Sequence, residues 1–283
     1  MKFEAVMNED TAVREFLNVS LSLQKLGKAC ILRLTKNKMY FIVSEEKLGP
    51  RRPMVWCELP VAFYFKDYKI QDNDDIILEL STSLLARTCS IFKQNAKMIK
   101  MKLLTPADAT YLTFEMELML EEMRIRRCVH DIPVELVARK YWTDYNEEPV
   151  FNDFHVSIQM PKLKSIKNVV EKIKTLGQSV TVSANRTGKL TLEINTNTVK
   201  LAAHFADLNV NSFAQEEVSN INEDDDKVSA TVDLKQLVMF LSGMQLMDCP
   251  LAVCSIVQGK MVKLFLEEPG ILKLQIFMFE LTI

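Results

Sequence analysis

The chain has 283 residues, of which 48% are hydrophobic, and it contains only seven glycines and nine prolines. A chain of this length and composition buries a sizeable core and favours about two domains, which excludes a largely disordered protein. The formal net charge of −2 by itself indicates no partner. The acidic start, MKFEAVMNED, and the lack of any run of about 18 apolar residues predict a soluble, intracellular protein without a membrane span.

One pattern of strand, helix, strand, turn and strand occurs four times along the chain. In the first copy, period-two strands flank an amphipathic helix, and a turn joins the last two strands into a hairpin. Its elements are Lys2–Met7, the helix Thr11–Gly27, Ala29–Leu34, the turn Thr35–Lys38 and Met39–Ser44. The four copies begin at Lys2, Asp75, Phe154 and Lys227. This self-similarity indicates a repeated supersecondary module.

The other three copies keep the same order of elements. The second has the strand Asp75–Ser81, the helix Thr82–Lys97, and the strands Met98–Leu104 and Tyr111–Leu120. The third has Phe154–Met160, the helix Lys162–Gly177, and a hairpin, Ser179–Asn195, that turns at Arg186–Gly188. The fourth has Lys227–Asp233, the helix Leu234–Leu246, Leu251–Val257 and Met261–Glu267, and a last strand, Ile271–Leu281, closes the chain.

Two copies in each half of the chain predict two similar domains. The polar, proline-containing segment Ala138–Asp153 lies between two strands and predicts a linker. We therefore expect an N-terminal domain at residues 1–137, a linker at residues 138–153 and a C-terminal domain at residues 154–283. The fold class is α+β, with two modules in each domain and the helices on one face of antiparallel sheets.

Basic side chains gather on the helix faces that point away from the predicted sheets. The predicted helical segments carry a net charge of +9, so the rest of this −2 chain totals −11. Ammonium and guanidinium groups on such a face suit double-stranded DNA, because they attract phosphates without reading bases. The candidate DNA-facing residues are Arg14, Lys25, Arg87, Lys93, Lys97, Lys164, Lys167, Lys172 and Lys235. The fourth helix exposes one lysine and the apolar Met239, so its part in DNA contact stays open.

No motif for catalysis or for a cofactor stands out. The chain lacks a glycine-rich phosphate loop, GxSxG, HExxH and any suitably spaced Cys–His pair. Its six cysteines form no CxxC pair, which indicates reduced, buried thiols, and its three histidines are too scattered for zinc. We expect no catalytic residues, no metal site and no cofactor.

Eight stretches, spread in order over the whole chain, carry a resemblance to a known family. They are MKF, MVWCEL, IILELSTSLLAR, VHDIPV, SIKNVVEKIK, HFADL, LVMFLSGMQ and CSIVQGKMV. No single stretch is diagnostic, but their number and order resemble the PCNA-like sliding clamps, and within them the Hus-one subunits of the nine-one-one checkpoint clamp. The resemblance implies the sliding-clamp (DNA clamp) fold, with helices lining a central hole and sheets outside.

The resemblance also implies a function. It predicts a non-catalytic subunit of a heterotrimeric ring, completed by a Rad-nine-like and a Rad-one-like subunit. Such a ring encircles double-stranded DNA independently of sequence, is loaded at damage sites by a clamp loader, and promotes checkpoint signalling and repair through further proteins. It implies no membrane and a nuclear location, with a cytoplasmic pool left open.

Ring formation would protect the terminal strands of each domain, which are otherwise unpaired edges. Two strands are candidates for this pairing, Tyr111–Met119 and Val262–Glu267. The expected interface residues are Tyr111, Thr113, Glu115, Val262, Leu264 and Leu266. The alternative is that either strand is internal to its own sheet.

Two other functions share these features. A homotrimeric PCNA-type replication processivity clamp would have the same modules and basic helices, and a stable homotrimer of the purified chain would indicate it. A scaffold that contacts only proteins would show unchanged retention on DNA after charge reversal of the helix lysines.

Overall fold

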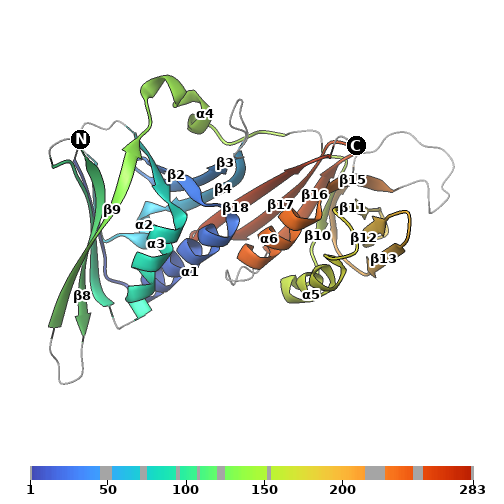
Figure 1. The fold of residues 1–283 in the computed structure, drawn as a ribbon, viewed down its shortest axis with the longest axis horizontal. Coiled ribbons are helices and arrows are strands. Elements are labelled where there is room, and N and C mark those ends of the chain that lie inside the picture. The colour runs from blue at the N-terminus through green and yellow to red at the C-terminus, as the bar shows by residue number, and fades with distance from the viewer. Residues whose placement is uncertain are drawn as a thin grey trace. The chain divides into compact units, whose positions relative to one another are not determined.

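The structure is a computed structural model that describes residues 2–44, 53–70, 75–93, 96–106, 109–119, 125–151, 154–213, 227–244 and 251–281 (Figure 1). The chain divides into two compact units. Unit 1 comprises Met1–Glu148 and Pro269–Lys273, and unit 2 comprises Pro149–Glu268 and Leu274–Ile283. The sequence predicts two domains, residues 1–137 and 154–283, joined by a linker at residues 138–153. These limits stay a prediction.

Unit 1 contains the first two modules and the segment that follows them. Its strands are β1 (Phe3–Met7), β2 (Ala29–Leu34), β3 (Lys38–Ser44), β4 (Pro53–Pro60), β5 (Asp67–Ile70), β6 (Ile76–Ser81), β7 (Ala96–Leu104), β8 (Thr110–Met119) and β9 (Ile125–Leu136). Its helices are α1 (Asp10–Leu26), α2 (Val61–Tyr64), α3 (Thr82–Cys89) and α4 (Thr143–Asn146), with 3-10 turns η2 (Ser90–Lys93) and η4 (Arg139–Tyr141).

Unit 2 contains the third and fourth modules. Its strands are β10 (Val156–Gln159), β11 (Ser179–Ala184), β12 (Leu190–Asn195), β13 (Lys200–Phe205), β14 (Val210–Phe213), β15 (Val228–Asp233), β16 (Leu251–Val257), β17 (Met261–Glu268) and β18 (Leu272–Phe279). The first two residues of β18 are grouped with unit 1. The helices are α5 (Leu163–Ile173) and α6 (Leu234–Met244).

The two modules of each unit exchange their first strands. In unit 1 the strand order is β4-β3-β2-β6-β9-β8-β7-β1-β5, so β1 pairs with β7 and β6 pairs with β2, both antiparallel. Unit 2 repeats the exchange in the orders β14-β10-β16-β17-β18 and β13-β12-β11-β15. Because each module completes the sheet of the other, the pair of modules is the folding unit.

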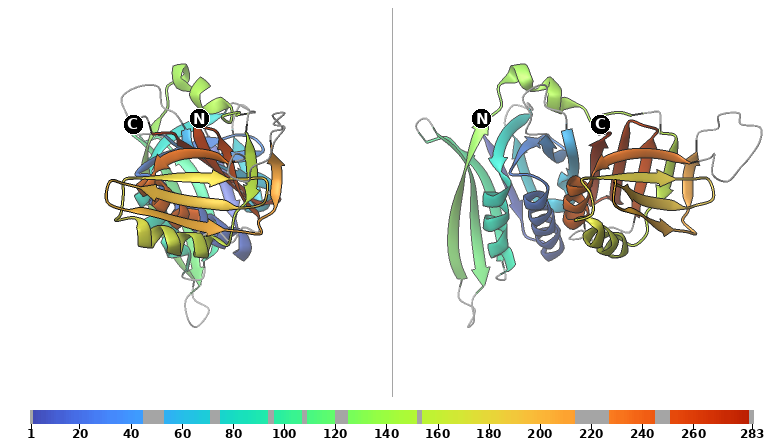
Figure 2. Two further views of the ribbon diagram at one scale, coloured as in Figure 1. Left: turned by 90° about the vertical axis from the view of Figure 1, so that its right-hand side faces the viewer. Right: turned by 45° about the vertical axis from the view of Figure 1, so that its right-hand side comes forward.

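The module helices of each unit, α1 with α3 and α5 with α6, lie side by side on one face of its sheets (Figures 1 and 2). Strand alternation explains this arrangement, since Phe3, Ala5 and Met7 of β1 are buried while the residues between them are half-buried. In unit 1 the Ser20 hydroxyl of α1 donates to the Phe16 carbonyl oxygen (2.8 Å) and lies 3.4 Å from the Cys89 Sγ of α3. Burial raises the pKa of that thiol to about 12, so Cys89 acts as a neutral core residue. No described helix is long and apolar enough to span a membrane.

These observations confirm the expected fold class of antiparallel sheets with helices on one face, built from repeated modules. The hairpin of the third module has its turn where expected. Gly188 has a φ of +80°, and a Cβ atom there would collide with the Leu208 carbonyl oxygen. The Leu208 amide donates to the Gly188 carbonyl oxygen (3.0 Å), so the turn needs glycine for both its φ and this close backbone approach.

The second helix is shorter than the sequence predicts. It ends at Cys89, continues as the 3-10 turn Ser90–Lys93, and the chain is a strand from Ala96. The segment from Ala96 onwards is a strand because it pairs with β8, beginning with Ala96 opposite Leu118. The helical pattern of the sequence alone does not reveal this pairing. The placement of Lys97 on a helix is therefore wrong, because Lys97 lies on β7.

The two strands expected as subunit edges are internal to their sheets. β8 pairs with β7 on one side and β9 on the other, and β17 lies between β16 and β18. The edge positions expected for Tyr111, Thr113 and Glu115 on β8, and for Val262, Leu264 and Leu266 on β17, are therefore wrong. The last three are at most 2% exposed and belong to the core. Chain order misled here because β8 and β17 are each followed by another strand that covers their outer edge.

Candidate nucleic-acid interface and assembly edges

Helix α5 has the most basic exposed face among the four module helices. Its buried side is formed by Ile166, Val170 and Ile173. On the other side Lys164 and Lys172 are exposed and Lys167 is half-buried, as the apolar period of the sequence predicts. These three lysines thus lie on one helix, away from its core contacts.

Further lysines lie at the two ends of α5. Lys162 precedes the first helical residue and Lys174 follows the last, and both side chains are exposed. The Lys174 ammonium pairs with the Glu171 carboxylate (2.5 Å) and lowers the pKa of that carboxyl below its ordinary value. Sequence reasoning counted both lysines in the helix charge but did not single them out as contacts.

Helix α3 offers fewer basic side chains than expected. The Ser81 hydroxyl caps its start by accepting from the Leu84 amide (3.4 Å), and Arg87 is exposed in its last turn. Lys93 ends the 3-10 turn that follows. Since Lys97 lies on β7, α3 with its 3-10 turn presents at most two of the three expected cations.

Helices α1 and α6 are weaker candidates. On α1, Arg14 has 68% of its side chain exposed but pairs with Glu15 (3.2 Å), and Lys25 is exposed in the last turn. On α6 the exposed Lys235 follows a cap in which the Asp233 carboxylate accepts from the Gln236 amide (2.9 Å). The described part of α6 has no other cation, so its contribution to a phosphate-binding surface is small.

The helices remain cationic within their observed bounds, but less so than the sequence ranges suggested. α1 is neutral, α3 with η2 carries +2, α5 carries +2 and α6 carries +1, so the helices total +5 and the rest of the −2 chain −7. The total falls because Lys97, Lys162 and Lys174 lie outside helices and Asp10 lies inside α1. A basic surface therefore survives in each unit, centred on α3 and α5.

Besides β5 and β14, which end their sheet orders, β9, β13 and β15 each leave at least part of one edge without a strand partner among the described residues. Residues 125–133 of β9 pair only with β8, because β6 reaches only Val134–Leu136, and β13 pairs only with β12. Ile125 and Val129 on β9 are 56% and 61% exposed. Unpaired backbone groups beside exposed apolar side chains provide a template for a strand of another chain. Sequence reasoning missed this edge, since neighbours in a sheet are not visible in chain order.

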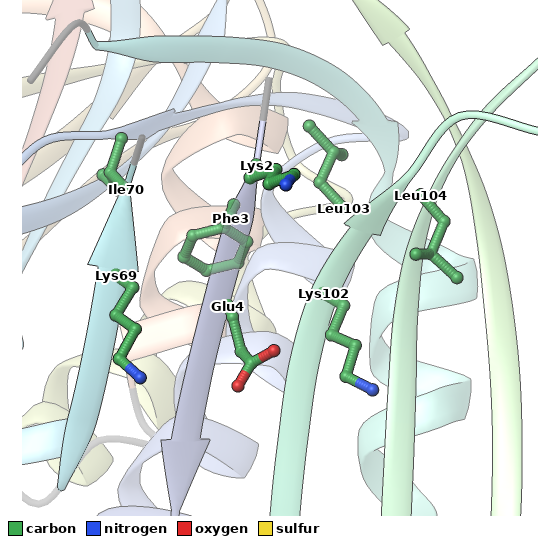
Figure 3. A pocket seen from close by; sticks show the side chains of 8 residues that line it. All are labelled: Lys2, Phe3, Glu4, Lys69, Ile70, Lys102, Leu103 and Leu104. Atoms are coloured by element: carbon green, nitrogen blue, oxygen red, sulfur yellow. The ribbon is translucent and has the colours of Figure 1, made fainter. Parts of the chain in front are cut away.

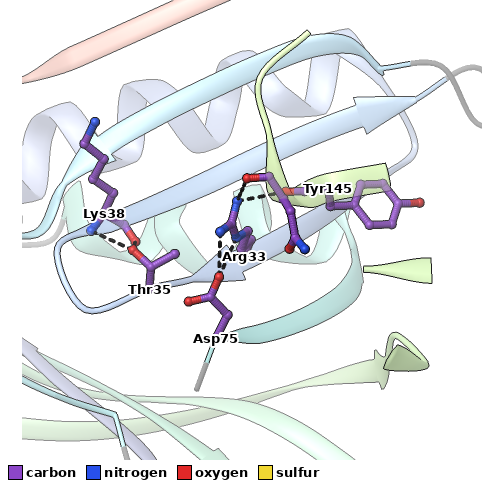
Figure 4. A network of polar contacts seen from close by, with 6 residues as sticks. Arg33, Thr35, Lys38, Asp75 and Tyr145 are labelled. Carbon is purple, nitrogen blue, oxygen red and sulfur yellow. Dashed lines mark hydrogen bonds and ion pairs between the residues drawn. The ribbon is translucent and has the colours of Figure 1, made fainter. Parts of the chain in front are cut away.

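Part of the expected linker is fixed on unit 1 by Arg33 of β2 (Figure 4). Its Nε donates to the Asp75 Oδ2 atom (2.8 Å). Its Nη1 donates to the carbonyl oxygens of Tyr145 (3.0 Å) and Asn146 (2.5 Å) at the end of α4. One planar guanidinium thus joins a strand, the start of the second module and the segment after β9.

Two neighbouring side chains reinforce this attachment. Tyr145 is only 2% exposed, and the Trp142 Nε1 atom donates to the Val137 carbonyl oxygen (2.8 Å). The segment from residue 138 to residue 146 is therefore an ordered strap on unit 1. The described residues contain no group of three or more side chains that could hold a metal ion.

The strand orders and the helix pairs define the fold, which is that of the sliding clamps. PCNA from Thermococcus kodakaraensis matches 98% of this chain and 99% of its own at a TM-score of 0.66 and 13% identity. PCNA from Entamoeba histolytica matches 98% of each chain at a TM-score of 0.68 and 13% identity. At this identity the two structures establish the fold alone.

The sequence comparisons identify the family within this class. A model of the family of Hus1-like proteins matches residues 1–281, and the chain belongs to that family. The chain is 35% identical over 266 residues to the human checkpoint protein HUS1, with 93% of each chain covered. It is 25% identical over 251 residues to the Hus1-like checkpoint protein of Drosophila melanogaster, with 87% of each covered. The expected family is thereby confirmed.

Proposed function

We propose that this chain is a non-catalytic subunit of a heterotrimeric checkpoint clamp that encircles DNA at damage sites and promotes checkpoint signalling and repair. The observation that carries the proposal is its similarity to checkpoint proteins along nearly the whole chain, on a fold that it shares with PCNA structures. The two other ring members are a Rad-nine-like and a Rad-one-like subunit. The protein acts in the nucleus, where its DNA substrate is.

In this proposal the exposed cations of α3 and α5 face the DNA. Arg87, Lys164 and Lys172 are exposed and lie on the side of their helices that is turned away from the core. Flexible lysine side chains attract phosphates along the backbone without reading base edges, which suits a ring that slides. Lys25 and Lys235 would add weaker contacts from α1 and α6.

Assembly in this proposal uses β9 of one subunit and β13 of the next. β9 belongs to unit 1 and β13 to unit 2, so pairing of unit 1 with a neighbour's unit 2 is head-to-tail and closes a ring when the rotation fits. The exposed Ile125 and Val129 add apolar contact area beside the new strand pair. The clamp loader and the checkpoint and repair proteins contact the surfaces that remain outside.

A homotrimeric PCNA-type replication clamp is less well supported. The chain is 35% identical to a checkpoint protein but only 13% identical to the two PCNA structures that share its fold. Homotrimer formation by the purified chain would favour this alternative.

Charge reversal on α5 tests the DNA-facing role. The variant combines Lys164→Glu with Lys172→Glu, and the matched control is Lys97→Glu, an exposed lysine on a strand. Retention of the assembled complex on immobilised duplex DNA is measured over a range of salt concentrations. Loss of two phosphate contacts should make the negative slope of log affinity against log salt less steep by about 1.8.

The control should behave like the unaltered complex. An equal loss in Lys97→Glu, or no loss in the α5 variant while the ring still assembles, would count against DNA-facing helices. A native mass spectrum of each variant complex separates a defect in DNA contact from a defect in assembly.

A further inference from the structure

A pocket of about 460 Å³ opens at the end of the unit 1 sheet, among β1, β5 and β7 (Figure 3). We call it the β5–β7 pocket, and its lining residues are Lys2, Phe3, Glu4, Lys69, Ile70, Lys102, Leu103 and Leu104. Phe3 and Leu103 are buried, whereas Ile70 is half-buried and Leu104 is 45% exposed. The pocket therefore combines an apolar surface with lysines at its rim.

Strand register places three of the charged side chains in one row. Glu4 of β1 is opposite Lys69 of β5 and Lys102 of β7, so the three side chains lie on the same face of adjacent strands. Because their neighbours Phe3 and Ala5 are buried under the helices, this row lies on the opposite face of the sheet. The site is thus separate from the cationic helix faces.

The carboxylates near the pocket do not balance its cations. Glu4 pairs with Lys100 (2.7 Å), and Lys102 pairs with Glu115 (2.7 Å). Lys100, followed by Lys102 and Lys69, lowers the pKa of the Glu4 carboxyl, so Glu4 is ionised. With Lys2 and Lys69 included, two positive charges remain in excess at a rim that belongs to a chain of net charge −2.

The equivalent place in unit 2 has a different composition. There β10, β14 and β16 occupy the positions of β1, β5 and β7, and the corresponding row is Ser212, Ser157 and Ser255. The Ser157 and Ser255 hydroxyl groups lie 2.7 Å apart. Since the same strand arrangement forms with uncharged serines, the fold does not require the lysines of the unit 1 row.

We propose that the β5–β7 pocket binds an extended, acidic segment of a partner protein, a role that goes beyond ring formation and DNA contact. Carboxylates of the segment lie against Lys2, Lys69 and Lys102, and an apolar side chain packs on the exposed Leu104 at the rim of the pocket. Charge complementarity selects the acidic residues and the apolar surface selects a peptide over a nucleic acid backbone. β5 ends the sheet, so the segment approaches the pocket without crossing another strand.

The test uses the full chain and a fluorescein-labelled peptide of ten residues in which glutamate and leucine alternate. Fluorescence polarisation should show saturable binding that weakens as salt is added. The double variant Lys69→Ser, Lys102→Ser installs the residues found at the equivalent positions of unit 2. It should weaken binding roughly two- to thirtyfold, the effect of losing two exposed charge pairs.

Three controls make the result decisive. Lys36→Glu, an exposed lysine on a turn of the same unit, should leave binding unchanged. A peptide of alternating lysine and leucine should not bind at the pocket. The glutamate–leucine peptide should protect the amides of β1 and β5 from hydrogen exchange in the unaltered chain, a measurement that needs no variant.

Equal binding by the double variant and the unaltered chain would overturn the proposal, as would protection confined to β9 or β13. Competition by a short DNA duplex that depends on Lys69 and Lys102 would also overturn it and indicate a phosphate site. Because none of these measurements involves a ring, failure here leaves the proposed clamp function standing, and failure of ring assembly leaves the pocket standing.

Discussion

Units 1 and 2 have equivalent strand arrangements but different outward-facing residues. Equivalent strands β1 and β10 bury apolar side chains on the helix side, Phe3 and Ala5 in one case and Val156 and Ile158 in the other. Facing away, β1 carries Glu4 and β10 carries Ser157. The inward positions specify the fold twice, whereas the outward positions are free to differ, and the functions proposed for each unit depend on them.

The equivalent strands β9 and β18, which follow the last module of each unit, also differ in side-chain exposure. β9 is exposed at most of its twelve positions and has an open edge, while most residues of the equivalent β18 are buried. The same place in the module is thus exposed in one unit and buried in the other, and the proposed assembly uses the exposed one. This contrast between inward and outward positions can be tested by substitution.

The largest change in stability is expected from a substitution at an inward, buried position. Leu264→Ala on β17 should lower the free energy of unfolding by about 2–5 kcal/mol, because Leu264 is 2% exposed and its loss leaves a cavity. Leu112→Ala on β8 of unit 1, where the side chain is 0% exposed, should have a similar cost. Urea unfolding monitored by circular dichroism measures both. The exposed Lys260→Ala serves as control and should stay within about 0.5 kcal/mol of the unaltered chain.

A cost below about 1 kcal/mol for Leu264→Ala would contradict the core assignment of β17 and return it to the candidate edge strands.

The next effect is expected at an outward position on an open edge. Val129→Asp on β9 should leave the stability of the chain nearly unchanged, since the side chain is 61% exposed. It should reduce partner capture at least about tenfold, because a charge would be buried in the proposed strand pair. Pull-down of co-expressed partner subunits measures the loss, and Ala62→Asp on the exposed side of α2 is the control. Full partner capture by Val129→Asp would remove β9 from the assembly surface.

A smaller, local effect is expected at the strap after β9. Arg33→Ala removes the contacts to Asp75, Tyr145 and Asn146, so the segment around α4 should open while the sheets remain intact. The local free energy of opening should fall by about 1–3 kcal/mol, as expected for hydrogen bonds to a charged group. Hydrogen exchange at residues 143–147 measures this change. Arg33→Lys should restore only part of the protection, because lysine lacks the planar fork, and unchanged exchange in Arg33→Ala would refute the attachment.

The sequence was sufficient to predict the four modules, because their strands and helices depend on local periodicity. Strand alternation and the amphipathic stripe of α5 predicted the elements and the exposure of Lys164 and Lys172. The prediction for Lys97 was wrong because the helical pattern of the sequence continues into a segment that pairs with β8 as a strand. Local pattern alone does not decide between such states when a distant strand supplies the hydrogen bonds.

Sheet order and the Arg33 attachment could not be read from the sequence. β8 and β17 lie inside their sheets because β9 and β18, the strands that follow them, cover their outer edges, while β9 and β13 have open edges. Arg33 meets Tyr145 and Asn146 across more than a hundred residues of chain, and no local signal marks that contact. The charges were visible in the sequence, but their grouping into helix faces and a sheet-end pocket depends on tertiary pairing.

The most direct test of the central claim is the native mass of the complex formed when this chain is co-expressed with a Rad-nine-like and a Rad-one-like subunit. The account predicts a single species that contains one copy of each of the three chains and that loses its partners when Val129→Asp is introduced. A stable homotrimer of this chain alone, or a failure to recover the three chains together, would contradict it.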